Sequence, residues 1–273
     1  MKRKTAIITG GSKGIGLSIA KILAKRNFNI VICSRNIKQL AKAKKNIESL
    51  QAKCVVIRAD ISNYNDCKKV IRETIKKFSS IDLLVNNAGY QGPVGKVWEN
   101  NISDWKNTID INLLGTFYML HEIIPHMLKQ KSGLILNLSG GGSVYARPCF
   151  SAYGSSKTAV LRLTETLHEE LKGKNINVIA IAPGAVWTSM TKSVLTKNSN
   201  RLNKKVISEL KILKKTGGTL ISKIENMIDF LVSGNSKKFS GKLIHVNEIE
   251  KLSELNRNIK DESGLLRRVD YKK

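Results

Sequence analysis

Short apolar runs alternate with longer segments of helical periodicity along almost the whole chain. Residues within the runs are continuously apolar, which indicates strands that are buried on both faces. One segment between two runs shows the other pattern, because Leu40, Ala43 and Ile47 recur at helical spacing. We therefore expect one doubly wound α/β domain, with a parallel sheet of about seven strands and helices on both faces. The expected strands span residues 5–9, 29–33, 54–59, 81–85, 133–138, 175–181 and 242–246.

No internal repeat or Pro/Ser-rich linker divides the chain, so we expect a single domain over residues 1–247. Residues 248–273 carry many charges of both signs, and we interpret them as a polar C-terminal tail. Residues 188–215 follow the sixth expected strand and have no strand pattern of their own. Connections of this length in compact domains commonly form lids or binding loops, so this segment is the expected substrate loop.

The chain carries 47 basic and 21 acidic residues, which gives a formal net charge of +26. Such an excess suggests a polyanionic partner, but the lysines are scattered over most expected helices and form no single patch. We therefore interpret the charge as solvated helix faces, with nucleic acid binding as the disfavoured alternative. No segment is apolar enough for a membrane-spanning helix or a signal peptide, which predicts a cytoplasmic protein with no membrane partner.

The four histidines and four cysteines lack the spacing of a metal site or of a disulfide framework. We expect free thiols in a reducing compartment, and no bound metal. Packing and surface roles suffice for the histidines, because they are spread over expected helices and the last expected strand.

A cluster of glycines separates the first expected strand from the first expected helix. Residues 9–16 read Thr-Gly-Gly-Ser-Lys-Gly-Ile-Gly. Glycines let the backbone turn sharply and approach a pyrophosphate, while the N-terminus of the next helix presents unpaired N–H groups to the anion. A glycine cluster is weak evidence alone, but at this place in a doubly wound sheet it predicts a dinucleotide site and a Rossmann domain.

Tyr153 and Lys157 are four residues apart at the start of an expected helix, so they share one helix face. Such a pair is expected about once by chance in a chain this rich in lysine, and Tyr64 with Lys68 is a second example. Tyr153 follows the fifth expected strand, at the carboxyl edge where open α/β sheets bind ligands. Because a nearby cation stabilises a phenolate, Tyr153 and Lys157 are the candidate acid–base pair.

These features resemble the short-chain dehydrogenase/reductase family over about residues 4–247. The family's Thr-Gly-x-x-x-Gly-x-Gly fingerprint is met at residues 9–16, and its Asn-Asn-Ala-Gly and Pro-Gly segments are met at residues 86–89 and 183–184. The resemblance implies a nicotinamide cofactor and a carbonyl–alcohol interconversion. The expected cofactor-binding residues are Gly10, Ser12, Lys13, Gly14, Ile15, Gly16, Ser34, Arg35, Asp60, Ile61, Asn87, Ala88, Gly89, Tyr153, Lys157, Pro183, Gly184, Val186 and Thr188.

The end of the second expected strand favours NADP(H) over NAD(H). A site for NAD(H) places a carboxylate there to bond the ribose 2′-hydroxyl, whereas this chain has Ser34 followed by Arg35. Lys13 lies in the glycine turn, at a position that is basic in the NADP-dependent members that this chain resembles. A guanidinium and an ammonium both suit a 2′-phosphate, so we expect NADP(H) as the cofactor. The same resemblance implies that Asp60 contacts the adenine and that Thr188 meets the carboxamide.

The resemblance also implies roles for four catalytic residues. Tyr153 exchanges a proton with the substrate, and Lys157 stabilises the phenolate and bonds the nicotinamide ribose. Asn112 holds a water in a proton relay to the lysine, and Ser139 helps to hold the substrate carbonyl. The nicotinamide itself carries the hydride.

One departure from the family pattern affects this serine. The family's serine lies 13 residues before the tyrosine, where this chain has Gly140. The glycine run 140–142 would let the loop bulge and absorb a slip of one residue. We therefore favour Ser139 as the serine that binds the carbonyl; the alternatives are Ser143 or no serine in this role.

We interpret the chain as an NADP(H)-dependent oxidoreductase that interconverts a carbonyl and an alcohol. Residues 188–215 carry eight basic residues and only one acidic residue, which favours an anionic substrate such as a nucleotide sugar or a carrier-bound acyl group. The same excess also fits lysines on a solvated helix. The alternative function is a non-catalytic dinucleotide sensor or scaffold with the same fold, against which the intact Tyr153 and Lys157 argue. By resemblance, we expect a homodimer or homotetramer formed through the helices that contain Asn112 and Tyr153.

Overall fold

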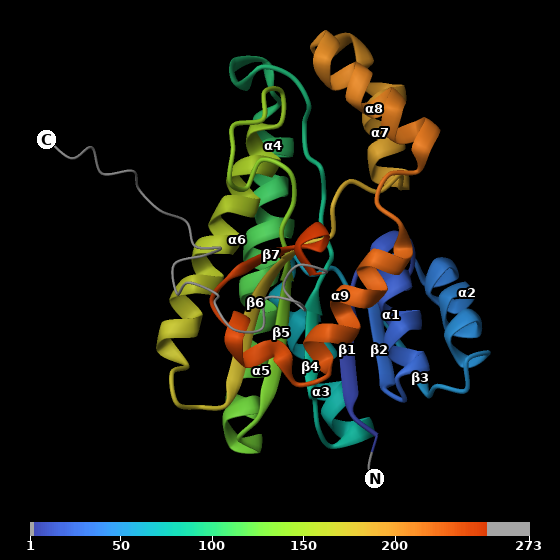
Figure 1. Ribbon diagram of the computed structural model, residues 1–273, viewed down its shortest axis with the longest axis vertical. Helices are drawn as coiled ribbons and strands as arrows, with labels where there is room; N and C mark the ends of the chain where they lie inside the picture. Colours follow the sequence, from blue (N-terminus) through green and yellow to red (C-terminus); the bar gives the residue numbers. More distant parts are fainter. Residues whose placement is uncertain (1–2, 250–273) are drawn as a thin grey trace, which may run out of the picture.

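The computed structural model describes residues 3–249, which fold around one all-parallel sheet of seven strands (Figure 1). The strands are β1 (Thr5–Thr9), β2 (Asn29–Ser34), β3 (Cys54–Arg58), β4 (Leu83–Asn86), β5 (Gly133–Leu138), β6 (Ile176–Ala182) and β7 (Leu243–His245). Their order across the sheet is β3-β2-β1-β4-β5-β6-β7. The doubly wound sheet predicted from the alternating pattern is confirmed, and each strand end lies within two residues of its expected position.

Helices cover both faces of the sheet because the strands carry apolar side chains on both sides. The helices are α1 (Gly14–Lys25), α2 (Ile37–Glu48), α3 (Tyr64–Phe78), α4 (Ile102–Ile109), α5 (Gly115–Gln130), α6 (Ser151–Glu170), α7 (Ser189–Lys197), α8 (Lys204–Thr216) and α9 (Ile221–Val232). Short 3₁₀ turns span Val97–Glu99, Ser199–Arg201, Asn235–Phe239 and Val246–Glu248. Ile8 of β1 belongs to a core with α1, α2 and α9, while its neighbour Ile7 belongs to a core with α3, α5 and α6. The two cores therefore lie on opposite faces of the sheet.

The strand order changes direction between β1 and β4, and open α/β sheets bind ligands at such a point. β2 and β3 extend from one side of β1, and β5 to β7 extend from the far side of β4 (Figure 1). Because all seven strands are parallel, the segments that follow β1, β4 and β5 leave the sheet at the same edge. This arrangement brings the glycine turn, residues 86–89 and the loop before Tyr153 to one carboxyl edge.

A π-helical turn, η2 (Asp110–Leu114), joins α4 to α5. Single π turns within helices are uncommon and occur frequently at functional sites. Asn112 lies at the centre of this turn and is fully buried. The turn therefore places a polar side chain in the interior, next to the start of α6.

The expected substrate loop folds into helices α7 and α8, which stand apart from the sheet (Figure 1). Residues 188–215 are called the lid below, and their role in covering a substrate stays a prediction. Val206 of α8 packs with Val94 and Phe150 in a small apolar cluster of its own. Arg201, between the two helices, donates a hydrogen bond of 2.9 Å to the main-chain oxygen of Glu99. The lysines of the lid whose side chains are described are exposed, so most of its positive charge faces solvent.

The expected C-terminal tail falls outside the described residues, apart from Glu248 and Ile249. Ile249 is buried in the core that contains α1 and α9. The domain boundary at residue 247 and the polar tail stay predictions. In the part of the chain that is described, no helix has the length and apolar character needed to cross a membrane.

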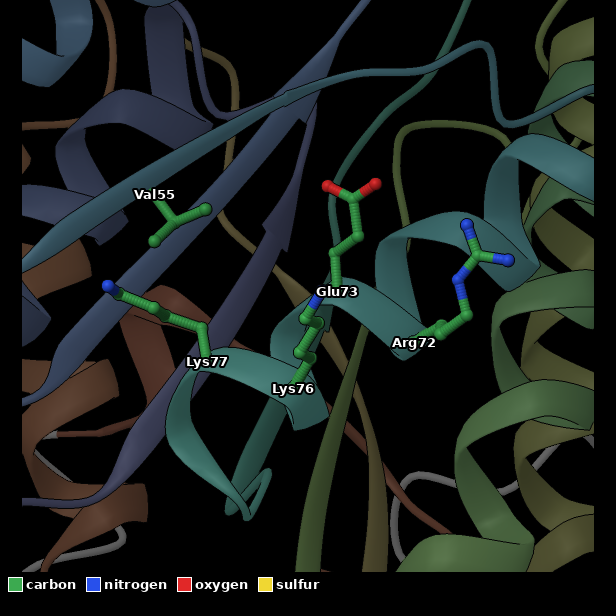
Figure 2. Close-up of a pocket in the computed structure, with 5 residues that line it drawn as sticks. All are labelled: Val55, Arg72, Glu73, Lys76 and Lys77. Carbon is green, nitrogen blue, oxygen red and sulfur yellow. The ribbon is translucent and has the colours of Figure 1, made fainter.

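A surface hollow lies between α3 and the edge strand β3 (Figure 2). Its lining residues are Val55, Arg72, Glu73, Lys76 and Lys77. They come from the first half of β3 and the second half of α3, so the hollow lies toward the amino ends of the strands. It is therefore separate from the carboxyl edge where the predicted site residues gather.

Candidate active site

The turn after β1 is bonded to the turn after β4. The side-chain oxygen of Thr9 accepts hydrogen bonds of 3.0 Å from the main-chain N–H groups of Asn87 and Ala88. In return, Asn87 Nδ2 donates to the main-chain oxygens of Thr9 at 2.7 Å and of Gly10 at 3.3 Å. A Cβ at position 10 would lie 2.9 Å from the Cα of Ala88, and Gly10 has a φ of +63°. These bonds fix two of the predicted cofactor segments side by side.

The N-terminus of α1 is free to receive an anion. No side chain caps this helix at Lys13, and its first turn contains no acidic residue. Gly14 has a φ of +56°, and a Cβ there would lie 3.7 Å from the methyl group of Thr188. A Cβ on Gly16 would overlap the side-chain amide of Asn87. The unpaired N–H groups of a helix start, in a cradle kept open by glycines, suit a pyrophosphate.

The end of β2 holds a buried hydroxyl without a partner. Ser34 Oγ is inaccessible to solvent and makes no hydrogen bond within the described residues. Arg35 follows it, with a guanidinium nitrogen 3.7 Å from a carboxylate oxygen of Asp60. The other carboxylate oxygen of Asp60 accepts hydrogen bonds from the main chain and hydroxyl of Ser62. An orphaned donor beside an arginine fits a phosphorylated ribose, and Lys13 lies exposed in the glycine turn.

Helix α6 carries Tyr153 and Lys157 one turn apart on a buried face. The Lys157 ammonium donates a hydrogen bond of 2.8 Å to the main-chain oxygen of Leu138 and lies 5.8 Å from the centre of the Tyr153 ring. Burial lowers the pKa of Lys157 to about 8. Burial also raises the pKa of Tyr153, and the positive charge of Arg147 opposes that rise. The tyrosine is thus a protonated donor at neutral pH with two cations in its surroundings.

Asn112 anchors the segment after β4 beside Lys157. Its Oδ1 accepts a bond of 2.7 Å from the main-chain N–H of Tyr90, and its Nδ2 donates at 2.9 Å to the main-chain oxygen of the same residue. The Nδ2 group also donates to the Ser156 hydroxyl at 2.9 Å. A Cβ on Gly89 would lie 3.4 Å from Asn112 Oδ1 and 3.8 Å from Lys157 Nζ, so these predicted residues converge. The water relay stays a prediction.

The loop after β5 pairs the two candidate serines with each other. Ser139 Oγ donates a hydrogen bond of 2.8 Å to Ser143 Oγ, and both residues are buried. A turn closed by the Ser143 N–H and the Gly140 oxygen, 3.2 Å apart, brings the hydroxyls together. A Cβ on Gly140 would lie 2.9 Å from Cε1 of Tyr153 and closer still to its hydroxyl oxygen. The space that a serine at 140 would need is therefore occupied by the tyrosine.

Three predicted cofactor residues use their side chains in contacts within the chain. Ile61 is buried, and its side chain packs directly against Gly115. Only the main chain of Ile61 is therefore available to a ligand. Val186 forms an antiparallel bridge with Gly218 and packs against the core that contains α1. Thr188 caps α7, with its hydroxyl 3.4 Å from the main-chain nitrogen of Thr191.

Two residues near the site were missed from the sequence. Arg147 lies against the glycine run 140–142, and its charge acts on the pKa of Tyr153. Gln91 follows the anchored Tyr90, and its buried Nε2 has no partner within residues 3–249. Neither residue belongs to a recognisable sequence motif. The three adjacent glycines 140–142 did indicate that other parts of the chain approach this loop closely.

The second Tyr–Lys pair lies away from the site. The Tyr64 hydroxyl donates a hydrogen bond to Glu122 on the outer surface of α3 and α5. Among the cysteines, all four are free, and burial raises the thiol pKa of Cys33, Cys54 and Cys67 to about 12. These thiols therefore stay protonated, and the candidate chemistry is confined to the carboxyl edge.

Comparisons with known proteins agree with this geometry. Residues 4–199 match the short chain dehydrogenase family. A 3-oxoacyl-(acyl-carrier-protein) reductase, FabG, from Staphylococcus epidermidis is 34% identical over 253 residues, which cover 89% of this chain and 97% of the reductase.

Solved structures share the fold. An NAD+-bound xylitol dehydrogenase has a TM-score of 0.80 and 26% identity, covering 89% of this chain and 96% of its own. An actinorhodin polyketide ketoreductase with NADPH has a TM-score of 0.81 over 89% of this chain and 95% of its own, and at 24% identity it supports the fold alone. The matched fold, the glycine turn and the Tyr153–Lys157 pair confirm the resemblance seen in the sequence: the chain belongs to the short-chain dehydrogenase/reductase family of oxidoreductases.

Proposed function

We propose that the protein reduces a carbonyl compound to an alcohol with NADPH, with Tyr153 as the proton donor. The observation that carries the proposal is the placement of the Tyr153 hydroxyl and the Lys157 ammonium at the carboxyl edge, beside the glycine turn. A bound nicotinamide would supply the hydride. The chain's own residues would bind the substrate, orient it and deliver the proton.

The environment of Tyr153 suits proton donation. Because burial raises its pKa, the hydroxyl is protonated at neutral pH and can give its proton to a carbonyl oxygen that is gaining negative charge. The phenolate left behind would be stabilised by Lys157 and by the more distant charge of Arg147. Since Lys157 is charged below a pKa of about 8, this support is present at neutral pH.

We propose that Ser139 and Ser143 act together on the substrate carbonyl. The Ser139 hydroxyl donates its hydrogen bond to Ser143 Oγ, so the Ser143 hydroxyl can donate a hydrogen bond to a carbonyl oxygen. Ser139 then orients the second hydroxyl, or contacts the carbonyl itself after a change of rotamer. Both residues therefore stay candidates for contact with the carbonyl.

Three groups would hold the 2′-phosphate of NADPH. They are the unpartnered Ser34 hydroxyl, the Arg35 guanidinium beside Asp60, and the Lys13 ammonium. The absence of a carboxylate at the end of β2 supports the same choice, because a carboxylate would repel the phosphate. The other predicted cofactor residues lie in the glycine turn, after β3, β4 and β6, and on α6.

The relatives suggest the substrate class. The FabG reductase from S. epidermidis carries a name that specifies a 3-oxoacyl group on acyl carrier protein. We propose a 3-oxoacyl thioester as the first substrate to test, with the basic lid as a source of long-range attraction for an acidic carrier. A homodimer or homotetramer through the helical segments that contain Asn112 and Tyr153, in the cytoplasm, completes the proposal.

The test follows NADPH oxidation with acetoacetyl thioesters of acyl carrier protein and of N-acetylcysteamine. Tyr153→Phe should retain NADPH binding and keep less than about one per cent of the turnover, because it lacks only the transferable proton. Tyr64→Phe is the matched control, since Tyr64 lies on the outer surface of α3 and should not affect turnover. Full activity of Tyr153→Phe would contradict the proposal. If the unmodified chain binds NADPH but turns over no carbonyl compound, the result would favour the alternative of a non-catalytic dinucleotide sensor or scaffold.

A further inference from the structure

Arg147 lies in the loop between β5 and α6, on the approach to Tyr153. Its guanidinium carbon is 4.1 Å from the centre of the Phe150 ring, which is buried in the apolar cluster that also holds lid residues. At this distance a cation is attracted by the negative face of the ring. A fixed aromatic partner therefore limits the directions in which the arginine can point.

The glycine run 140–142 leaves the space that this arginine occupies. A Cβ on Gly141 would lie 3.2 Å from a terminal nitrogen of Arg147, and a Cβ on Gly142 would lie 3.2 Å from its Cβ. Gly142 also has a φ of +94°, which other residues rarely adopt. Two neighbouring glycines of the run therefore contact the two groups: Gly140 contacts the Tyr153 hydroxyl, and Gly141 contacts the Arg147 guanidinium.

The guanidinium has no anionic partner among residues 3–249. No carboxylate of the described residues lies within 4.0 Å of it, and no described group accepts a hydrogen bond from it. A guanidinium has five N–H donors, and those of Arg147 are open to solvent and not sealed in the interior. These donors are therefore available to an anion that enters the site.

The arginine is also close to the reacting atoms. The Tyr153 hydroxyl lies against Gly140 and the guanidinium lies against Gly141. Because adjacent Cα atoms are about 3.8 Å apart, the two groups are separated by at most about 12 Å. An anion held by Arg147 would then be joined to the carbonyl by only a short carbon chain.

We propose that Arg147 binds an anionic group of the substrate, a carboxylate or a phosphate, carried a few bonds from the reacting carbonyl. The proposal rests on carbonyl reduction at Tyr153 and is independent of the 3-oxoacyl thioester. A planar guanidinium binds either group through two parallel hydrogen bonds. The exposed lysines of the lid act at longer range and are screened by salt, so they cannot provide the same selectivity.

The test compares carbonyl compounds that differ in charge, using the full chain and Arg147→Gln. One pair is a short keto acid and its methyl ester, and the other is a keto phosphate and its uncharged alcohol. Arg147→Gln should lower kcat/KM for the preferred anion roughly 10- to 100-fold, the loss expected for a charge-assisted hydrogen-bonded pair. Its effect on the neutral partner should stay below about threefold. The pair that responds identifies the anionic group.

Two further variants separate binding from charge and from folding. Arg147→Lys keeps the charge without the two-pronged geometry and should recover only part of the selectivity. Arg72→Gln removes one positive charge at the remote hollow of Figure 2 and should change neither pair. Equal losses for an anion and its neutral partner in Arg147→Gln would overturn the proposal, since they would indicate a structural role.

A binding measurement distinguishes this proposal from the proposed function. Calorimetry with NADPH present would measure the affinity of saturated carboxylic acids and alkyl phosphates, which cannot be reduced. Affinity that falls at least tenfold in Arg147→Gln supports the anion site even if no carbonyl compound is turned over. Turnover of carbonyl compounds without any Arg147-dependent selectivity or binding overturns the anion site and leaves carbonyl reduction standing.

Discussion

Replacing Gly140 by serine restores the residue that the family carries at this position, yet it should nearly abolish turnover. A Cβ at 140 would lie 2.9 Å from Cε1 and 3.0 Å from Cζ of Tyr153, and closer still to the hydroxyl oxygen. Favourable carbon contacts begin at about 3.5 Å, so the phenol must move by roughly 0.5 to 1 Å. A displacement of about 1 Å in a catalytic group can cost about 100-fold in rate.

The assay measures kcat with NADPH and an uncharged carbonyl compound, together with NADPH affinity and the midpoint of unfolding. Gly140→Ser should lose about 100-fold in kcat while NADPH affinity changes little, because the three atoms nearest to a Cβ at position 140 all belong to Tyr153. Gly141→Ala is the matched control: the nearest atoms to its Cβ would be the Tyr145 hydroxyl oxygen at 3.1 Å and a terminal nitrogen of Arg147 at 3.2 Å, and no atom of Tyr153 is among them. That variant should lose less than about threefold with an uncharged compound.

An active Gly140→Ser would refute this reasoning. If its kcat equals or exceeds that of the natural chain, Tyr153 works from a position other than the one against Gly140. The added hydroxyl would then fill the family's serine role, and the pairing of Ser139 with Ser143 would have no part in catalysis. A large loss in Gly141→Ala with the uncharged compound would also count against the argument, since the loop itself would be intolerant of any side chain.

Three other perturbations test the remaining parts of the site. Ser34→Asp combined with Arg35→Ala should shift the ratio of kcat/KM values from NADPH toward NADH, because a carboxylate repels the 2′-phosphate; an unchanged ratio would mean that the phosphate is bound elsewhere. Ser139→Ala and Ser143→Ala should each lower kcat by about 100-fold, and the double variant should lower it little further, because one hydrogen bond joins the two hydroxyls. The pKa of Lys157 is about 8 in the folded chain against an ordinary value of 10.5, so the unfolded chain binds more protons between these pH values. The free energy of unfolding should therefore rise by up to about 3 kcal/mol as the pH increases from about 8 to 10.5, and denaturant titrations of Lys157→Met should lack this contribution.

The sequence was sufficient to predict the parts of the molecule that depend on local pattern. The continuously apolar runs predicted a sheet with helices on both faces. Neighbouring residues such as Ile7 and Ile8 point to opposite faces, so both faces must be buried under helices. The glycine turn was predictable because its φ values and close approaches admit few other residues. Tyr153 could be told from Tyr64 because the order of strands and helices places only one of them at the carboxyl edge.

Contacts between distant segments could not be predicted in the same way. The bonds from Asn112 to Tyr90 depend on a π turn, for which residues 110–114 give no visible signal. The lid was expected as a loop, and its two helices depend on apolar residues that pack with Phe150. The sequence does not distinguish Arg147 from other loop arginines, because its proposed role depends on its contacts with the glycine run 140–142 and with Phe150.

The departure at position 140 is best understood as part of a coordinated change in one loop. Without a side chain at 140, the Tyr153 hydroxyl can lie against the backbone, and the turn that follows brings Ser139 and Ser143 to 2.8 Å. The next two glycines make room for Arg147, whose charge opposes the rise in the pKa of that tyrosine. A single added side chain at 140 would displace the proton donor, whereas one at 141 would mainly displace the guanidinium. The same run of glycines would therefore determine both where the proton is delivered and which charge the substrate carries.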